Sequence, residues 1–221
     1  AKIDEYYVDS EGKMVTSAWV ELKNEEDPDS PETPDTFWYY FEKDGKSAVS
    51  KWVKFDSKWY YFDESGHMAT GKTEIDGATY YLGTEKDGFM RTGWIRLEEN
   101  SHAPGASESW YYFNSDGKMV TTQYDKKIDG SYYTFIDGKM QTGWLLYNNS
   151  WYYLSESGAM VTGWITLGDK AYYLGGDGGM LTGWQNIDGQ IYYLYPDGHK
   201  AVNEVIDTFY VDQDGVWRKP Q

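Results

Sequence analysis

The stretch WLLYNNSWYY, from Trp144 to Tyr153, contains every element of a β-hairpin. Asn148-Asn149 at its centre fits a two-residue type I′ turn, because asparagine tolerates the positive φ angles that this turn requires. A turn centred there places Trp144 across from Tyr153, with Trp151 two residues along on the same face. The middle tyrosine, Tyr152, then points to the opposite face. The stretch therefore predicts a hairpin with two tryptophans and a tyrosine on one face and a single tyrosine on the other.

The same pattern recurs along nearly the whole chain. After the hairpin come a glycine, a methionine two positions later and then Thr-Gly-Trp, as in Gly158, Met160 and Thr162-Gly163-Trp164. The corresponding glycines, most of them 20 to 22 residues apart, are Gly12, Gly45, Gly66, Gly88, Gly117, Gly138, Gly158, Gly178, Gly198 and Gly215. The corresponding methionines are Met14, Met68, Met90, Met119, Met140, Met160 and Met180. Such a period is typical of solenoids, so we expect residues 1–221 to form an all-β solenoid of about ten stacked hairpins, each of about 20 residues.

Two repeats are longer than the others. The additional residues lie near 22–37 and near 97–109, between a repeat's first tryptophan and its Trp-Tyr-Tyr, where a hairpin turn is expected. Because the repeat phase resumes after each insertion, we interpret both as extended hairpin loops rather than linkers between domains. Residues 201–221 are expected to close the solenoid as a terminal cap.

Composition and charge restrict the partners. The chain has 36 acidic and 20 basic residues and a net charge of −16, which disfavours nucleic acid and suits a cationic ligand. It has no cysteine, so disulfides and thiolate metal sites are excluded. No apolar run approaches the roughly 20 residues of a membrane span, so no membrane insertion is expected. The three histidines are scattered and the glycine-aspartate stretches fit turns, so we expect neither a metal site nor a cofactor.

The aromatic residues are predicted to form binding sites between hairpins. Stacking would place the tryptophan face of one hairpin against the middle tyrosine of the next, and three rings around a gap make an aromatic cage. Simple core packing is the alternative for any such cluster. Several repeats depart from the aromatic pattern, at Lys72 with Thr79, Gln123 with Ser131, Ala171 and Ile191. Positions that tolerate such replacements are not strict packing requirements, which favours binding where the set is complete.

The pattern Thr-Gly-Trp, turn, Trp-Tyr-Tyr and Gly-x-Met closely resembles the choline-binding repeats of streptococcal surface proteins, autolysins and phage lysins. It is also similar to the glucan-binding repeats of streptococcal glucosyltransferases. In the choline-binding family, two tryptophans of one hairpin and a tyrosine of the next, often with a methionine, surround the trimethylammonium of teichoic-acid phosphocholine.

The resemblance implies four complete sets of rings, which we call the first to fourth ring sets. They are Trp19 with Trp38 and Tyr60, Trp52 with Trp59 and Tyr80, Trp94 with Trp110 and Tyr132, and Trp144 with Trp151 and Tyr172. It also implies Met68 and Met160 as methionine partners. Two weaker candidates lack the second tryptophan, namely Trp164 with Tyr192, and Trp184 near Phe209.

Three functions fit this pattern. The preferred one is a non-catalytic module that binds choline or phosphocholine of teichoic or lipoteichoic acid and anchors a protein, extracellularly, at the bacterial surface. The second is an α-glucan-binding module that stacks sugars on the same rings, and the third is an adhesin scaffold with a host-protein partner. Because the repeats occupy the chain, any catalytic domain of a parent enzyme is expected outside it.

Overall fold

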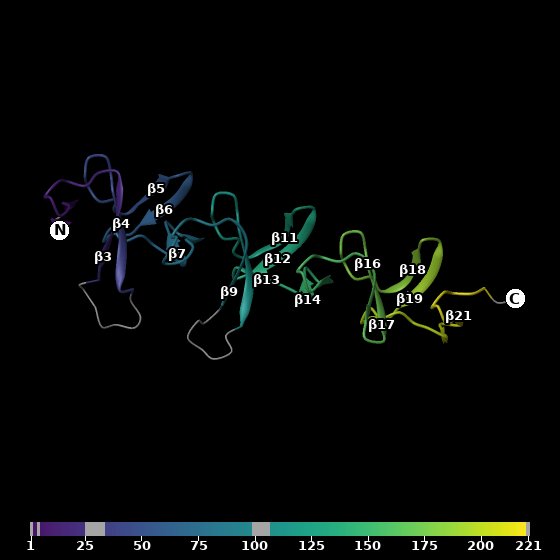
Figure 1. The fold of residues 1–221 in the computed structure, drawn as a ribbon. Helices are drawn as coiled ribbons and strands as arrows, with labels where there is room; N and C mark the ends of the chain where they lie inside the picture. Colours follow the sequence, from purple (N-terminus) through teal and green to yellow (C-terminus); the bar gives the residue numbers. More distant parts are fainter. Residues whose placement is uncertain (1, 4, 25–33, 99–106, 220–221) are drawn as a thin grey trace. The chain divides into compact units, whose positions relative to one another are not determined.

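The computed structural model describes residues 2–3, 5–24, 34–98 and 107–219, and the regular elements in them are β-strands. They belong to two compact units, Ala1–Val120 and Thr121–Gln221. Figure 1 shows each unit as a series of antiparallel hairpins, each followed by a loop that leads to the next. The described residues include no helix long and apolar enough to cross a membrane.

Consecutive strands pair into hairpins in both units. The strands of the first unit are β1 (Lys2–Ile3), β2 (Tyr6–Tyr7), β3 (Ala18–Lys23), β4 (Thr36–Phe41), β5 (Lys51–Phe55), β6 (Lys58–Phe62), β7 (Lys72–Ile75), β8 (Ala78–Tyr81), β9 (Gly93–Glu98) and β10 (Glu108–Phe113). Those of the second are β11 (Gln123–Ile128), β12 (Ser131–Ile136), β13 (Lys139–Met140), β14 (Gly143–Tyr147), β15 (Ser150–Leu154), β16 (Gly163–Leu167), β17 (Lys170–Leu174), β18 (Gly183–Ile187), β19 (Gln190–Leu194), β20 (Glu204–Ile206) and β21 (Phe209–Val211). The predicted all-β solenoid of stacked hairpins is confirmed within each unit.

The register of the quoted hairpin agrees with the turn at its centre. Trp144 pairs with Tyr153 and Leu146 pairs with Trp151, so both tryptophans lie on one face. Asn148 and Asn149 have φ angles of 48° and 61°, the positive values that a type I′ turn requires at both central residues. The predicted turn and register are therefore confirmed here.

Both insertions fall at hairpin turns. β3 and β4 pair as far as Lys23 with Thr36, and β9 and β10 pair as far as Glu98 with Glu108. Most of the inserted residues, 25–33 and 99–106, lie outside the described residues. The hairpins on either side keep the regular register, with Trp19 opposite Tyr40.

Beside smaller or less deeply buried residues such as Ile75, Tyr80 and Val120, each hairpin from β3–β4 onward contributes to the core one large apolar residue. This residue follows the second tyrosine in most hairpins and is fully buried. The fully buried set is Phe41, Phe62, Leu82, Phe113, Phe135, Leu154, Leu174, Leu194 and Val211. By contrast, the second tryptophans Trp59, Trp110 and Trp151 keep 40%, 42% and 42% of their surface exposed. These tryptophans are therefore not core residues, which answers the packing alternative at three positions.

Backbone hydrogen bonds and a methionine join successive hairpins. The Met180 N–H donates to the carbonyl of Trp151 in the preceding hairpin at 2.7 Å. Gly178 has a φ of +83°, and a Cβ at this position would lie 2.5 Å from Met160 Sδ of the previous repeat. Only glycine satisfies both the left-handed backbone and this close contact. The recurring Gly-x-Met pattern therefore reflects how one repeat packs on the next.

One hairpin departs from the predicted register. The pairing of β11 with β12 shifts between Gln123 and Lys126, because Asp125, with a φ of 55°, is an extra residue in β11. Tyr132 is the second residue after the Asp129-Gly130 turn and pairs with Lys127, so it takes the place that a second tryptophan takes in other hairpins. The prediction that put Ser131 in that place was wrong by one residue.

Candidate aromatic binding sites

The fourth ring set lines an open cavity of about 290 Å³. Trp144 and Trp151 stand almost perpendicular, with ring centroids 6.4 Å apart and an interplanar angle of 89°. Tyr172 comes from β17 of the next hairpin, and its ring centroid lies 5.1 Å from that of Trp144. Met180 and Asp197 complete the lining. The structure thus brings together the three predicted rings and adds two residues that the sequence argument had not selected.

The methionine of each ring set comes from the loop after the hairpin that supplies the tyrosine. Met180 occupies this place in the fourth set, whereas Met160 lines a separate pocket with Tyr132 and Tyr152. In the first set, the Met68 N–H donates to the Trp38 carbonyl at 2.8 Å, in the same manner as Met180. The order of repeats alone could have paired each methionine with its set.

The first set is joined across two hairpins. The ring centroids of Trp19 and Tyr60 lie 4.8 Å apart at an interplanar angle of 66°. Trp38 stands two residues before Tyr40, the cross-strand partner of Trp19, so it shares the face of Trp19. Phe55 also contacts Trp19, with centroids 5.9 Å apart. Although this hairpin carries an insertion at its turn, the ring distance and angle between Trp19 and Tyr60 are close to those between Trp144 and Tyr172.

In the second set the first tryptophan again meets the tyrosine of the next hairpin. Trp52 and Tyr80 have ring centroids 5.0 Å apart at 63°, and Met90 packs against the buried cluster that contains Tyr80. Trp59 is exposed, and the Lys54 ammonium lies 5.6 Å from the centroid of its ring. A cationic ligand at Trp59 therefore competes with the exposed Lys54 ammonium for the face of the ring.

The third set is divided between the two units. Trp94 and Trp110 belong to the first unit, with centroids 6.4 Å apart at 85°, close to the values for Trp144 and Trp151. Tyr132 belongs to the second unit and takes the position of a second tryptophan rather than of a middle tyrosine. The register gives the middle position to Tyr133. The third set as a binding site stays a prediction.

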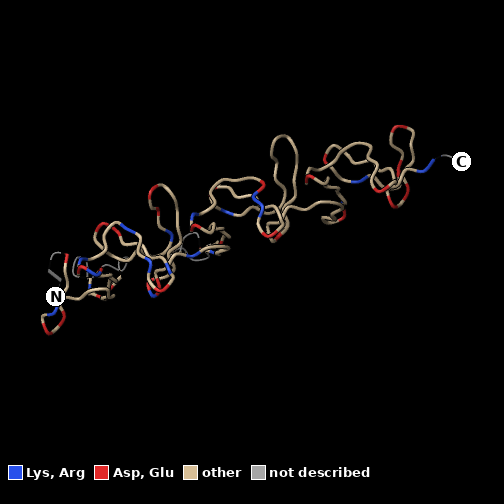
Figure 2. The backbone as a smooth tube through the Cα atoms, turned by 90° about the horizontal axis from the view of Figure 1, so that it is seen from above, with Lys and Arg blue, Asp and Glu red and all other residues tan. Residues whose placement is uncertain are grey.

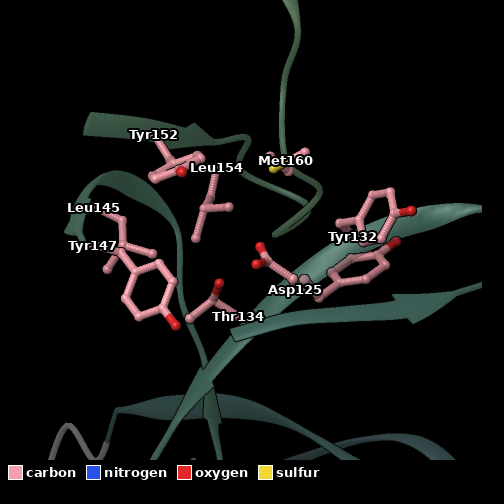
Figure 3. A pocket seen from close by; sticks show the side chains of 9 residues that line it. Asp125, Tyr132, Thr134, Leu145, Tyr147, Tyr152, Leu154 and Met160 are labelled. Carbon is pink, nitrogen blue, oxygen red and sulfur yellow. The ribbon is translucent and has the colours of Figure 1, made fainter. Parts of the chain in front are cut away.

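The bulged hairpin has a closed pocket. Tyr124 stands where other hairpins have the first tryptophan, and its ring stacks on Tyr147 with centroids 4.0 Å apart at 12°. Figure 3 shows the carboxylate of Asp125 pointing into the space between Tyr132 and Tyr152. The cavity there measures only about 10 Å³, room for at most one water molecule. This pocket cannot accept a trimethylammonium group as it stands.

A lysine occupies the weaker candidate formed by Trp164 and Tyr192. The two rings lie 4.9 Å apart at 67°, like the corresponding pairs in the complete sets. Lys200 takes the methionine position, and its ammonium lies 5.2 Å from the Trp164 ring and 5.8 Å from the Tyr192 ring. The ammonium also donates a 2.8 Å hydrogen bond to the carbonyl of Asp214. The chain thus places a cation of its own against this pair of rings.

The other weaker candidate lies beside a cavity of about 270 Å³. Trp184 and Phe209 have ring centroids 5.8 Å apart at 84°. Ile191 and Trp217 complete the lining. Trp217 was not among the predicted site residues, because its spacing from Gly215 is the one that other repeats fill with methionine.

Several of the aromatic clusters have a carboxylate nearby that comes from the loop of a later hairpin. Asp197 lies in the loop after β19, yet it lines the cavity between β14–β15 and β17. Burial raises the pKa of the middle tyrosines Tyr60, Tyr152 and Tyr192, and nearby carboxylates raise it further. Those carboxylates include the equivalent loop residues Asp87, Asp177 and Asp214. The rings therefore lie in a negative potential, which favours a cationic ligand.

Asp197 is ionised at neutral pH. Partial burial acts to raise its pKa, but hydrogen bonds from His199 outweigh that effect and hold the pKa below its ordinary value. The Lys170 ammonium, 3.6 Å away, shares its charge. Figure 2 shows further Asp and Glu residues in turns and loops of both units.

Sequence and structure comparisons identify the family. Residues 49–94, 126–162 and 161–205 match the family described as choline-binding repeat, and residues 106–119 match the putative cell wall binding repeat. The structure of CbpJ from Streptococcus pneumoniae TIGR4 is similar, at 32% identity and a TM-score of 0.77, over 96% of this chain and 75% of that chain. The chain belongs to the choline-binding repeat family.

Other choline-binding structures agree. Choline binding protein F from Streptococcus pneumoniae is 32% identical over 97% of this chain and 75% of that one, with a TM-score of 0.73. The modular autolysin LytC from the same organism is 26% identical over 81% of this chain and 40% of its own, with a TM-score of 0.60. No curated protein sequence matches. Choline-binding repeats similar to these therefore occur in binding proteins and in a modular autolysin.

Proposed function

We propose that the chain is a non-catalytic cell-wall-binding module that captures choline of teichoic or lipoteichoic acid between successive hairpins. It holds a protein at the outer surface of a bacterium without a covalent bond. The observation that carries this proposal is the cavity lined by Trp144, Trp151 and Tyr172, with Asp197 also in its lining. Membership of the choline-binding repeat family supports it.

The chemistry of the cavity suits choline. A quaternary ammonium has no N–H to donate, and each ring face contributes about 0.5–2 kcal/mol to its binding. Three rings give roughly −4 kcal/mol, which corresponds to a dissociation constant near 1 mM. The carboxylate attracts the cation further, whereas an uncharged sugar gains nothing from its charge. These features favour choline over an α-glucan.

The proposal assigns different states to the ring sets. The first, second and fourth sets bind choline. The pair of Trp164 and Tyr192 stays without ligand, because the Lys200 ammonium already occupies the ring faces. The pocket beside Asp125 is closed. The module therefore binds fewer ligands than it has hairpins.

Choline is expected to stabilise the folded chain and to change its tryptophan fluorescence, whereas dextran is not. At a concentration twenty times the dissociation constant, each occupied site adds roughly 1.8 kcal/mol to the free energy of unfolding. Thermal unfolding and fluorescence titration with each ligand measure this. A response to dextran with none to choline would make the chain a glucan-binding module.

Asp197→Asn tests how much the carboxylate contributes to choline binding, because it removes the negative charge and keeps the size of the side chain. The affinity of the fourth set for choline should fall by a few fold, because the carboxylate is partly exposed and shared with Lys170. The interaction of choline with the first set should not change. An unaltered choline affinity in the fourth set contradicts a role for this carboxylate.

Replacing Lys200, together with adding the missing second tryptophan, should create a choline site. Ala171→Trp supplies the missing second tryptophan, and Lys200→Met supplies the methionine found in the other sets and frees the ring faces. The double variant should bind one more choline per chain than the natural sequence, as counted by equilibrium dialysis. Ala171→Trp alone should gain none, because Lys200 still lies over Trp164 and Tyr192. An equal gain in the single variant contradicts the blocking role of Lys200.

A further inference from the structure

The last described hairpin repeats the backbone of a ring set with different side chains. Val211 is buried at the core position, so Phe209 stands where other hairpins have the middle tyrosine. The backbone N–H of Trp217 donates a 2.8 Å hydrogen bond to the carbonyl of Ile191, as the backbone N–H of Met180 donates to the carbonyl of Trp151. Trp217 therefore takes the methionine position, and Ile191 takes that of the second tryptophan.

These replacements restore the number of rings. The centroid of Trp217 lies 6.1 Å from that of Phe209 at 74°, and Phe209 lies 5.8 Å from Trp184. The three rings and Ile191 line a cavity of about 270 Å³, close to the 290 Å³ of the fourth set. Loss of the second tryptophan is thus compensated by a tryptophan at the methionine position.

The cavity differs chemically from the fourth set. Among the described residues, its lining contains no carboxylate. The residue after Trp217 is Arg218, whose Nε donates a 2.7 Å hydrogen bond to Asp212 Oδ2. An ammonium with N–H groups would find no acceptor on these side chains and would lose its hydration without compensation. A trimethylammonium group has no N–H to satisfy, so it alone suits a site made of ring faces.

We propose that Trp184, Phe209 and Trp217 form an additional binding site that selects a fully methylated ammonium group. The inference rests on the proposed function, since it assumes that the same module meets choline. It extends that function to a ring set in which neither the paired tryptophans nor a carboxylate is present. The site excludes ethanolamine, the unmethylated counterpart of choline.

The test is fluorine NMR of protein labelled with 5-fluorotryptophan, which reports on each of the 11 tryptophans. Choline should shift the Trp184 and Trp217 resonances together at millimolar concentration, and ethanolamine should leave both unchanged. The Trp144 and Trp151 resonances serve as the internal reference. If these two respond to choline while Trp184 and Trp217 do not, the additional site is wrong and the proposed function stands. If none responds, the proposed function itself fails.

Variants of Trp217 separate a binding role from a structural one. Trp217→Met should weaken the choline response of Trp184 at least tenfold and leave that of Trp144 intact, which also shows that the chain is folded. Trp217→Phe should keep the response, because it retains a ring and removes a buried indole N–H that has no hydrogen-bond partner among the described residues. A normal response in Trp217→Met overturns the site, as does a response to ethanolamine equal to that to choline.

Discussion

Removing two ring sets together is expected to shorten retention on immobilised choline by a factor of about 10² to 10⁴, far more than either removal alone. The variant is Trp59→Ala with Trp151→Ala, which removes the second tryptophan from the second and fourth sets. Both side chains are about 40% exposed, at 40% and 42%, so their loss disturbs the core little. Single millimolar sites hold a polymer only when several are engaged at once. Surface plasmon resonance on a choline-bearing surface measures the dissociation rate.

Two comparisons make this result specific. Val202→Ala removes a similarly exposed apolar side chain outside the four ring sets and should leave retention unchanged. Free choline should release the natural chain, whereas moderate salt should not, because ring contacts are screened less than exposed ion pairs. A proportional loss in the double variant, or release by salt alone, would show that general electrostatic attraction holds the chain.

Leu154→Ala is expected to destabilise the fold by about 2–5 kcal/mol, whereas Trp151→Ala, three residues away in the same strand, changes stability much less. Leu154 is 2% exposed and belongs to the core, while Trp151 is 42% exposed. Because each repeat contacts only its neighbours, the loss of one core residue weakens the adjoining hairpins as well. Chemical denaturation without choline measures both variants.

Choline should stabilise the same two variants to different extents. Leu154→Ala, while folded, should keep the choline-dependent rise in stability, and Trp151→Ala should lose the contribution of one site. If Trp151→Ala proves as destabilising as Leu154→Ala, then Trp151 is a packing residue and the fourth set loses its main support.

Hairpin register follows from local chemistry and was therefore predictable. Asn148 and Asn149 specify the turn, and alternation along the strands then fixes which face carries Trp144 and Trp151. The meeting of Trp144 with Tyr172 follows from repetition alone. The three rings of the fourth set, and the Trp–Tyr pairs of the first and second sets, lie together for this reason.

Departures from the repeat were harder to predict because most depend on a tertiary relation. Counting back from Gly138 misplaces Tyr132 by one position, because the loop from Phe135 to Gly138 is one residue shorter than the loop from Leu154 to Gly158. Lys200 and Trp217 both stand where a methionine is usual. Only the structure shows that Lys200 covers the rings of Trp164 and Tyr192, whereas Trp217 adds a ring to the pair of Trp184 and Phe209. Asp197 reaches a cavity built by earlier hairpins, a separation that no local pattern encodes.

The joint between neighbouring hairpins has a mechanical consequence. Each hairpin is held by its own ladder of strand pairs, while the Met180 N–H on the Trp151 carbonyl is a hydrogen bond that links one hairpin to the preceding one. Under tension we expect the chain to lengthen first by separating hairpins, before any hairpin unzips. A ligand gripped by Trp144 and Trp151 on one side and Tyr172 on the other opposes that separation. Hairpins with choline bound between them should therefore be stiffer under tension than hairpins without ligand.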